Sequence, residues 1–341
     1  MSQQTQPEPD QKQSTYTDPN VYLKLDPIKK IQSKLARSID YEHIIITRFS
    51  YRFKKDMPIG ELFSHKRLQR RFQLFETFCL PSVLSQVNPN FYWIIIIDAE
   101  LPTEYVDRLW KSIAKFYGSN KYSKFGPRQI FVHRWDWTCT LTELTWIEKY
   151  IQFHKRYLIT TRLDDDDSIC REFTNIMAQY LRENKIRGLK LLSLSNGYYW
   201  YNQPKVAYGI FKQTNKPWIA IGLSLITERS KFPMTVYFGN HTKLTGYLRN
   251  WQDHRTLKKY VEKSKENITP KTYVNYFEVI RRTKPIYIRS VHDHNLQRNE
   301  TNKFLDKSGI ALKRASLHSP NMLNKYFTIN IAGLEKVNSA I

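Results

Sequence analysis

Four consecutive aspartates, Asp164–Asp167, are the feature of this sequence with the clearest chemical potential. Adjacent carboxylates repel one another, so a folded chain keeps them together only where something offsets their charge. A hard divalent cation does so, because it prefers oxygen ligands such as carboxylates and phosphate oxygens. In an extended segment residues i and i+2 point to the same side, so Asp164 and Asp166 can face one ion while Asp165 and Asp167 point elsewhere. The run predicts a Mn²⁺ or Mg²⁺ site.

Such a site would suit a substrate that carries a diphosphate. An ion held by few carboxylates keeps coordination positions open for phosphate oxygens, and it stabilises the charge on a departing nucleoside diphosphate. Arg162, two residues before the run, could donate to the same phosphates. An acidic run can equally be a solvated loop or a helix cap, and Asp-x-Asp is a weak motif by itself. Its place between a β-branched strand and a helix favours the metal site.

The segments that position these residues alternate between strand and helix patterns. We expect strands over 41–47, 91–97, 129–132 and 156–161, helices over 66–85 (interrupted at Pro81), 103–116, 143–153 and 168–183, and a hairpin over 189–211 that turns at Asn196–Gly197. This alternation implies crossover units and a parallel sheet covered by helices. In such sheets the ligand lies beyond the carboxyl ends of the strands, where Arg48, Asp98 and the aspartate run are expected.

The composition indicates a globular protein with a basic surface. The chain has 341 residues, of which 41% are apolar and 25% charged, and its net charge of +23 favours polyanionic partners. The Lys and Arg residues are spread along the chain without a nucleic-acid-binding motif, so we expect no specific nucleic acid but allow a peripheral contact with an anionic membrane. Three separated cysteines, no long apolar segment and a polar N-terminus predict a soluble, cytoplasmic protein.

The domain organisation expected from the sequence is simple. Residues 1–38 are rich in polar residues and proline and are expected to form a disordered tail. Residues 39–300 are expected to form one compact domain, because no linker or internal repeat interrupts them. Residues 301–341 would follow as a basic C-terminal segment.

Several segments, taken in order, carry a resemblance to a known family. They are IIITRFS (44–50), RLQRRFQLFETFCLPSVLSQ (67–86), FYWIIIIDAELP (91–102), YLITTRLDDDDSI (157–169) and, more weakly, YIRSVHDHN (287–295). Together they resemble the rhamnosyltransferase family of GT-A-fold glycosyltransferases, over roughly residues 41–295. The resemblance implies a Rossmann-like, GT-A-like nucleotide-binding sheet, a nucleotide-sugar donor, and a divalent metal at the Asp-x-Asp motif.

The resemblance also assigns roles to the aspartates. Asp164 and Asp166 match the metal-binding motif, and Asp167 matches the carboxylate next to it. Asp165 stands where the family often has a non-acidic residue, which leaves open which alternating pair binds the metal. We therefore count Asp165 among the donor-binding candidates.

Further donor-site residues follow from the ends of the first two strands. Asp98 matches the position where related enzymes contact the nucleotide base or ribose. Thr47 and Arg48 would line the same pocket, and Arg162 would join them.

The remaining candidates come from the second half of the chain. His292 could complete the metal site, with weaker claims for His294 and His241, although each could be a surface or capping histidine. Asp253 is the candidate general base if the reaction inverts configuration, but it could instead belong to a salt-bridged helix face. The aromatic run 198–201 could stack a sugar ring or pack in the core.

Three classes of function are compatible with these features. The first is a metal-dependent glycosyltransferase that moves a sugar, with rhamnose as one candidate, from a nucleotide-sugar to a glycan or glycolipid acceptor. The second is a Mg²⁺-dependent nuclease or phosphotransferase, which would usually gather acidic residues from several separate segments. The third is a non-catalytic basic protein that binds polyanions. The sequence favours the first.

Overall fold

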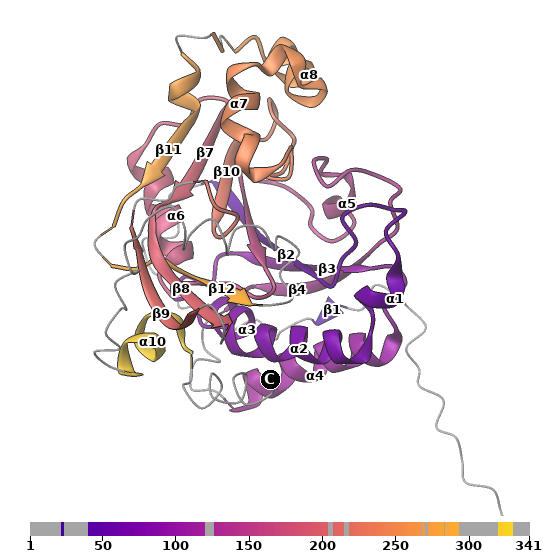
Figure 1. The fold of residues 1–341 in the computed structure, drawn as a ribbon. Coiled ribbons are helices and arrows are strands. Elements are labelled where there is room, and N and C mark those ends of the chain that lie inside the picture. The colour runs from indigo at the N-terminus through magenta and orange to yellow at the C-terminus, as the bar shows by residue number, and fades with distance from the viewer. Residues whose placement is uncertain are drawn as a thin grey trace, which may run out of the picture.

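The chain forms an α/β structure with two sheets, shown by the computed structural model in Figure 1. The structure describes residues 22–23, 40–119, 126–203, 207–214, 218–266, 268–269, 272–282, 284–292 and 320–329. The central sheet has eight strands in the order β1-β4-β3-β2-β5-β10-β7-β11, and the smaller sheet has four in the order β6-β12-β8-β9.

The bounds of the strands are as follows. The central sheet consists of β1 (Tyr22–Leu23), β2 (Tyr41–Phe49), β3 (Tyr92–Asp98), β4 (Gln129–Trp135), β5 (Tyr157–Asp164), β7 (Leu189–Leu194), β10 (Leu223–Glu228) and β11 (Phe277–Ile280). The smaller sheet consists of β6 (Ser168–Ile169), β8 (Asn196–Gln203), β9 (Ala207–Thr214) and β12 (Tyr287–His292).

The helices lie between and around these strands. They are α1 (Ile59–Leu62), α2 (His65–Leu74), α3 (Leu80–Leu84), α4 (Thr103–Ser119), α5 (Thr145–Glu148), α6 (Phe173–Glu183), α7 (Leu244–Arg249), α8 (Arg255–Ser264) and α10 (Pro320–Phe327). A π-helical turn, Phe75–Cys79, joins α2 to α3. Two short 3₁₀ helices, His241–Lys243 and Trp251–Asp253, flank α7.

The order of the parallel strands reverses between β2 and β5. Strands β4, β3, β2 and β5 are mutually parallel and lie in the order third, second, first, fourth along the chain. In doubly wound sheets the point where this order reverses is where ligands bind, beyond the carboxyl ends of the strands. Strand β10 then joins β5 and β7 in antiparallel pairs. This arrangement confirms the predicted α/β, GT-A-like fold with a mainly parallel central sheet covered by helices.

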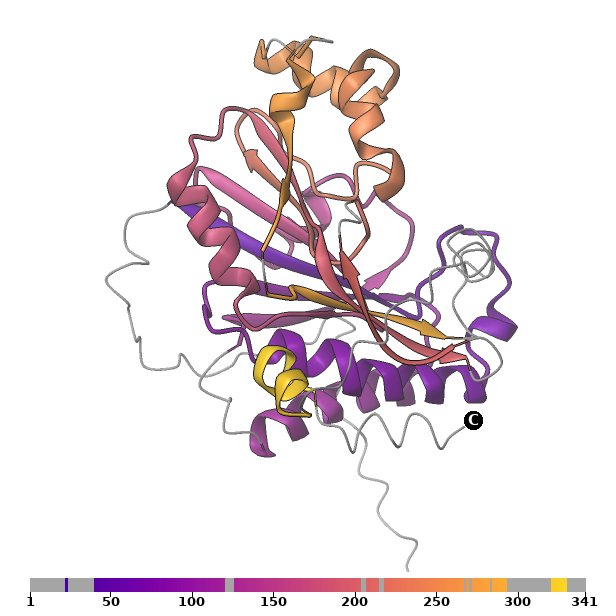
Figure 2. The ribbon, with the colours of Figure 1, turned by 60° about the vertical axis from the view of Figure 1, so that its left-hand side comes forward.

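Strands β2, β3, β4, β5, β7 and β10 contribute side chains to two separate cores. In β2, Ile45 and Phe49 pack with α2, α3, α4 and α6, whereas Ile44 and Ile46 pack into the core of the opposite face with α5, α7 and α8. Figure 2 shows α2 and α4 beneath the sheets and α7 and α8 gathered at the far end. Both faces are therefore buried, which explains why these strands are continuous β-branched runs in the sequence.

Three predicted elements differ in extent from the sequence-based expectation. The helix expected over 143–153 is the single turn α5, because Thr142 donates a hydrogen bond to the carbonyl of Tyr237 and Glu143 forms a β-bridge with Met234. The helix expected from 168 begins at Phe173, because Ser168–Ile169 pairs with β12 as strand β6. At Pro81 the helix is not broken, since the wider π-helical turn comes directly before it.

The hairpin expected to turn at Asn196–Gly197 is wrong. Strand β7 ends at Leu194 and belongs to the central sheet, while Asn196 and Gly197 open β8, whose antiparallel partner is β9. Glycine is needed at position 197 for packing. A Cβ atom there would lie 2.4 Å from the ring of Tyr287 and 2.6 Å from its carbonyl oxygen.

Most residues near the two ends of the chain lie outside the part that the structure describes. The tail expected over 1–38 lies outside the described residues except for β1, which pairs with β4. Within the C-terminal segment expected over 301–341, α10 places Leu323 and Phe327 in the core. The domain boundaries drawn from the sequence stay predictions. No helix within the described ranges is long and apolar enough to cross a membrane.

A substitution at Gly197 tests the contact between β8 and β12. Gly197→Ala would force a methyl group against the Tyr287 ring, so we expect it to lower the free energy of unfolding by about 1–3 kcal/mol. The matched control is Gly246→Ala in α7, where a Cβ meets no atom within 4 Å; it should be neutral or add about 0.5–1 kcal/mol. Urea unfolding of the two variants measures this, and equal effects would contradict the packing argument.

A buried histidine makes the stability of the sheet depend on pH. His43 is 1% exposed, its Nε2 lies 2.8 Å from the hydroxyl of Thr161, and burial lowers its pKa to about 3. Below the ordinary histidine pKa of 6.5 the unfolded chain binds a proton that the folded chain excludes, so stability present above this pH is lost on acidification. Between about pH 7.5 and pH 5, His43 should account for about 2 kcal/mol of lost stability.

Urea unfolding of wild type and His43→Gln at the two pH values checks this expectation. The variant should lose less stability on acidification by about the same 2 kcal/mol, because glutamine does not titrate. His133, whose pKa burial also lowers, to about 4, is present in both proteins and cancels in the comparison. An identical pH dependence in both proteins would refute the role of His43.

Candidate active site at the aspartate run

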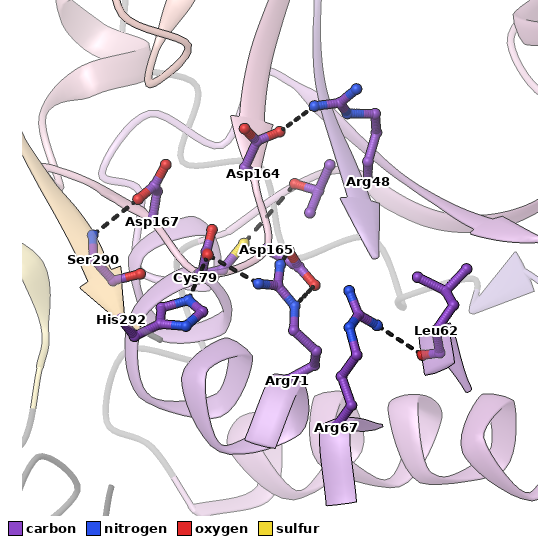
Figure 3. Close-up of polar contacts among 12 residues, drawn as sticks. Arg48, Leu62, Arg67, Arg71, Cys79, Asp164, Asp165, Asp167, Ser290 and His292 are labelled. Atoms are coloured by element: carbon purple, nitrogen blue, oxygen red, sulfur yellow. Dashed lines mark hydrogen bonds and ion pairs between the residues drawn. The ribbon is translucent and has the colours of Figure 1, made fainter. Parts of the chain in front are cut away.

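The aspartate run lies where β2 and β5 end side by side. Asp164 is the last residue of β5, and it is the register partner of Arg48 in β2. The chain then turns, with the amide of Asp167 donating to the carbonyl of Asp164 (3.2 Å), and continues into β6 of the smaller sheet. Figure 3 shows α2 approaching the run from one side and β12 from another. Four separate elements therefore meet at the carboxylates.

Asp164 is held by two arginines that share its face of the sheet. Nη2 of Arg48 lies 2.9 Å from Oδ1 of Asp164, and Nη2 of Arg162 lies 3.5 Å from Oδ2. Both guanidinium groups stack over the ring of Tyr237, at 5.5 and 5.3 Å from its centroid. Burial opposes ionisation of Asp164, but Arg162 and Arg48 outweigh it and hold its pKa well below the usual range. The carboxylate is thus ionised and lies beside two guanidinium groups.

Arg71, on α2, bridges the next two carboxylates. Its Nε donates to Oδ2 of Asp165 (3.1 Å) and its Nη1 to Oδ2 of Asp166 (2.9 Å), while Nη2 also contacts Asp165 (Figure 3). Sequence reasoning did not identify Arg71. The available signal was the arginine-rich start of the predicted helix, RLQRR, but nothing in the sequence indicated which arginine faces the aspartates.

The smaller sheet supplies partners for the last two aspartates. Nε2 of His292 lies 3.0 Å from Oδ2 of Asp166, and the backbone amide of Ser290 donates to Oδ1 of Asp167 at 3.0 Å. Burial, together with the nearby charges of Asp166 and Asp164, raises the pKa of Asp167 well above its ordinary value. Both contacts come from β12, more than a hundred residues further along the chain. The structure therefore brings His292 to the aspartates, as the sequence predicted.

The side chains of Asp164 and Asp166 are the ones in the run that reach solvent to an appreciable degree. They are 26% and 12% exposed, whereas that of Asp165 is 1% exposed and Asp167 is a buried residue. The segment is a turn after Asp164 and not the extended run that the sequence analysis assumed, yet the same two carboxylates are the more exposed ones. Among the described residues, no group of three or more His, Cys, Asp or Glu side chains is arranged to hold a metal ion. The oxygen donors fit a hard divalent cation, but arginines already pair with them.

Asp98 lies at the end of β3 and is fully buried. Its partner is Arg52, which the sequence did not indicate. Arg52 donates from Nε to Oδ2 (2.7 Å) and from Nη2 to Oδ1 (2.9 Å), and its Nη2 also contacts Glu100 at 2.6 Å. This two-pronged pairing fixes the loop after β2 to the end of β3. In the described arrangement both carboxylate oxygens of Asp98 face Arg52. Its contact with a nucleotide stays a prediction.

Thr47 and Arg48 point to opposite faces of β2, as neighbouring strand residues must. The Thr47 hydroxyl accepts a hydrogen bond from Nε1 of Trp93 (3.0 Å) and lies 3.9 Å from the thiol of Cys79. It is fully buried in the core above the π-helical turn. Arg48 instead faces Asp164. The structure therefore brings Arg48, but not the side chain of Thr47, to the aspartate run.

The other candidates are distributed over several places. His241 is half-buried near Asp164 and Arg162, and its pKa is lowered to about 4, first by burial and then by Arg162. Asp253 is exposed in the short helix between α7 and α8, and none of the contacts among the described residues links it to the aspartates. Tyr198, Tyr199 and Trp200 are buried in β8. His294 and the side chain of Tyr201 lie outside the described part of the chain.

A family model described as "Putative rhamnosyl transferase" matches residues 42–276, which is more than half of the chain. The chain belongs to this family. The match includes β2, β3, β5 and the aspartate run, and it confirms the predicted glycosyltransferase at the level of the family. It does not extend to Ser290 and His292.

Solved structures and curated proteins add little to this assignment. Residues 1–349 of TarS from S. aureus are 14% identical, with a TM-score of 0.33, over 74% of this chain and 60% of that one, so the chain spans less than two thirds of TarS. A "putative nucleotide-diphospho-sugar transferase" from Desulfovibrio desulfuricans G20 is 9% identical, with a TM-score of 0.34, over 89% and 96%. No curated protein matches the chain significantly.

Proposed function

We propose that the chain is a metal-dependent glycosyltransferase that moves a sugar from a nucleotide-sugar donor to a hydroxyl group of a glycan or glycolipid acceptor. The observation that carries the proposal is the cluster at the carboxyl ends of β2 and β5, where Arg48, Arg71 and Arg162 surround two partly exposed carboxylates. Arginines match the geometry of phosphate oxygens, and open α/β sheets bind nucleotides where the strand order reverses, as it does between β2 and β5. The family supports glycosyl transfer over a nuclease or a non-catalytic polyanion-binding protein.

In this proposal, different residues of the cluster bind the metal ion and the phosphates of the donor. Asp164 and Asp166 would hold Mn²⁺ or Mg²⁺, with Asp167 and His292 supporting Asp166 and the turn that carries it. When bound, such an ion neutralises charge that develops on the departing diphosphate. Arg48 and Arg162, positioned by Tyr237, would donate to the same phosphates. Asp98 remains the candidate for contact with the nucleotide base or ribose. To make this contact, its carboxylate would have to give up a hydrogen bond to Arg52.

The family description supports rhamnose as the transferred sugar, and the basic composition supports an acceptor near a polyanionic surface. A net charge of +23 would attract an anionic membrane or an acidic glycan. The three cysteines are unpaired, with Cys79 and Cys170 buried and Cys139 half-buried, which supports a cytoplasmic setting. Sugar, acceptor, membrane contact and compartment belong to the proposal.

Thermal unfolding with a panel of ligands tests the donor site. We expect a nucleoside diphosphate (UDP, GDP or dTDP) together with Mn²⁺ to raise Tm by several degrees, because ligands that bind only the folded state stabilise it by mass action. Asp166→Asn should lose this shift, since it removes one of the two partly exposed carboxylates. The control is Asp107→Asn, an exposed aspartate on α4, which should shift like wild type. A folded wild type that responds to none of the nucleotides would overturn the proposal.

The general base is tested separately, with the donor that the panel identifies. If Asp253 deprotonates the acceptor hydroxyl, Asp253→Asn should lower kcat by about 10²-fold or more while leaving the shift with donor and Mn²⁺ unchanged. Release of nucleoside diphosphate measures turnover, and Glu262→Gln, exposed on α8, is the control. Near-normal turnover in Asp253→Asn would remove this residue as the base and leave the donor site intact.

A further inference from the structure

The position of Arg71 between Asp165 and Asp166 is not explained by donor binding alone. We propose that Arg71 is the resident counter-ion of Asp165 and Asp166, and that it makes cation binding at the aspartates depend on a diphosphate bound at the same time. This inference rests on the proposed function and concerns how the site is loaded. It assigns to Arg71 a positioning role that neither the sequence motifs nor the family match identify.

Arg71 contacts two of the four aspartates through three of its nitrogen atoms. Its guanidinium engages Asp165 through Nε (3.1 Å) and through Nη2, and Asp166 through Nη1 (2.9 Å). The side chain of Arg71 is 11% exposed and that of Asp165 is 1% exposed, so the pairing is shielded from solvent. A guanidinium that forks onto carboxylates in such surroundings is held more firmly than a surface ion pair.

The balance of charge explains why a cation alone would bind poorly. Arg48 and Arg162 pair with Asp164, while Arg71 pairs with the next two carboxylates. Three guanidinium groups thus face three carboxylates. A divalent ion that arrives alone would have to displace Nη1 of Arg71 from Asp166. The guanidinium would keep Asp165 but would have no second anionic group to replace Asp166. The competition weakens metal binding without preventing it.

A diphosphate changes this balance. It brings negative charge, offers Arg71 oxygen atoms of the geometry that guanidinium prefers, and supplies further oxygen ligands to the metal. Metal and diphosphate should therefore each increase the affinity of the site for the other, by the same factor, as linkage requires. Arg67, one turn earlier on α2, makes a different contact: its Nη1 donates to the carbonyl of Leu62 at 2.7 Å (Figure 3). None of the hydrogen bonds or ion pairs found among the described residues joins it to the aspartates.

The experiment measures Mn²⁺ affinity by thermal unfolding, with and without the nucleoside diphosphate that stabilises wild type most. In wild type, we expect the nucleotide to tighten Mn²⁺ binding by about tenfold or more. In Arg71→Met, Mn²⁺ alone should bind about tenfold more tightly than in wild type. The effect of the nucleotide should fall several-fold, to what its oxygen ligands supply directly to the metal. Arg67→Met removes the same charge from the same helix without breaking a hydrogen bond to the aspartates, so it should change Mn²⁺ affinity and the nucleotide effect much less than Arg71→Met does.

The outcomes separate this inference from the proposed function. If Arg71→Met binds Mn²⁺ no more tightly than wild type and keeps the full effect of the nucleotide, the role of Arg71 is refuted while the donor site stands. If wild type binds no nucleotide in the presence of Mn²⁺, the proposed function fails and the inference fails with it. Should Arg71→Met not fold, because Asp165 is left buried without a partner, Arg71→Met with Asp165→Asn removes that charge and carries the same expectations.

Discussion

The structure depends on one electrostatic constraint, which is that four adjacent carboxylates must be kept together in a largely buried place. Isolated charges in such surroundings are costly, and like charges side by side add to the cost. The fold meets the constraint with arginines from three elements, β2, α2 and β5, and with a histidine and a backbone amide from β12. Strands β2, β5 and β12 and helix α2 bring these groups together around the carboxylates.

Strand register explains which groups meet. The parallel pairing of β2 with β5 places Arg48 opposite Asp164, and the alternation of side chains puts Arg162 on the same face, where both arginines lie over the Tyr237 ring. The same alternation sends Thr47 into the core on the other side, against Trp93 and Cys79. A shift of one residue would exchange these two sets. The hydrophobic contacts on both faces of the sheet therefore also hold the charged groups in position.

The smaller sheet connects distant parts of the chain to the site. Strand β6 begins directly after the aspartates and pairs with β12, so the short extended segment that follows the run brings Ser290 and His292 to it. Strand β12 in turn pairs in parallel with β8, where Gly197 allows the Tyr287 ring to pack closely. Packing in this sheet thus supports the geometry of the carboxylates, because β12 carries both Ser290 and His292.

The sequence by itself determined the parallel strands of the central sheet and the end of the sheet at which polar residues gather. Continuous β-branched runs bounded by helical patterns predicted a helix-covered parallel sheet, and the aspartates at the end of such a run indicated where its polar residues would gather. Periodicity describes single segments, however, and two kinds of information lie outside it. One is which segments pair, and so the sequence analysis misplaced the turn at Asn196–Gly197 and extended a helix through Ser168. The other is which charged side chains face one another.

Only the tertiary structure decided the partners of the carboxylates. Arg71 is one of several arginines in its segment, and Arg52 is one of many basic residues in a chain of net charge +23, so neither stood out in the sequence. Their roles follow from helix α2 lying against the end of β5 and from the loop after β2 folding onto Asp98. Such contacts join residues 46 to 126 positions apart. Local sequence patterns determine whether a segment forms a strand or a helix. The charged side chains that it contacts depend on which distant segments pack against it.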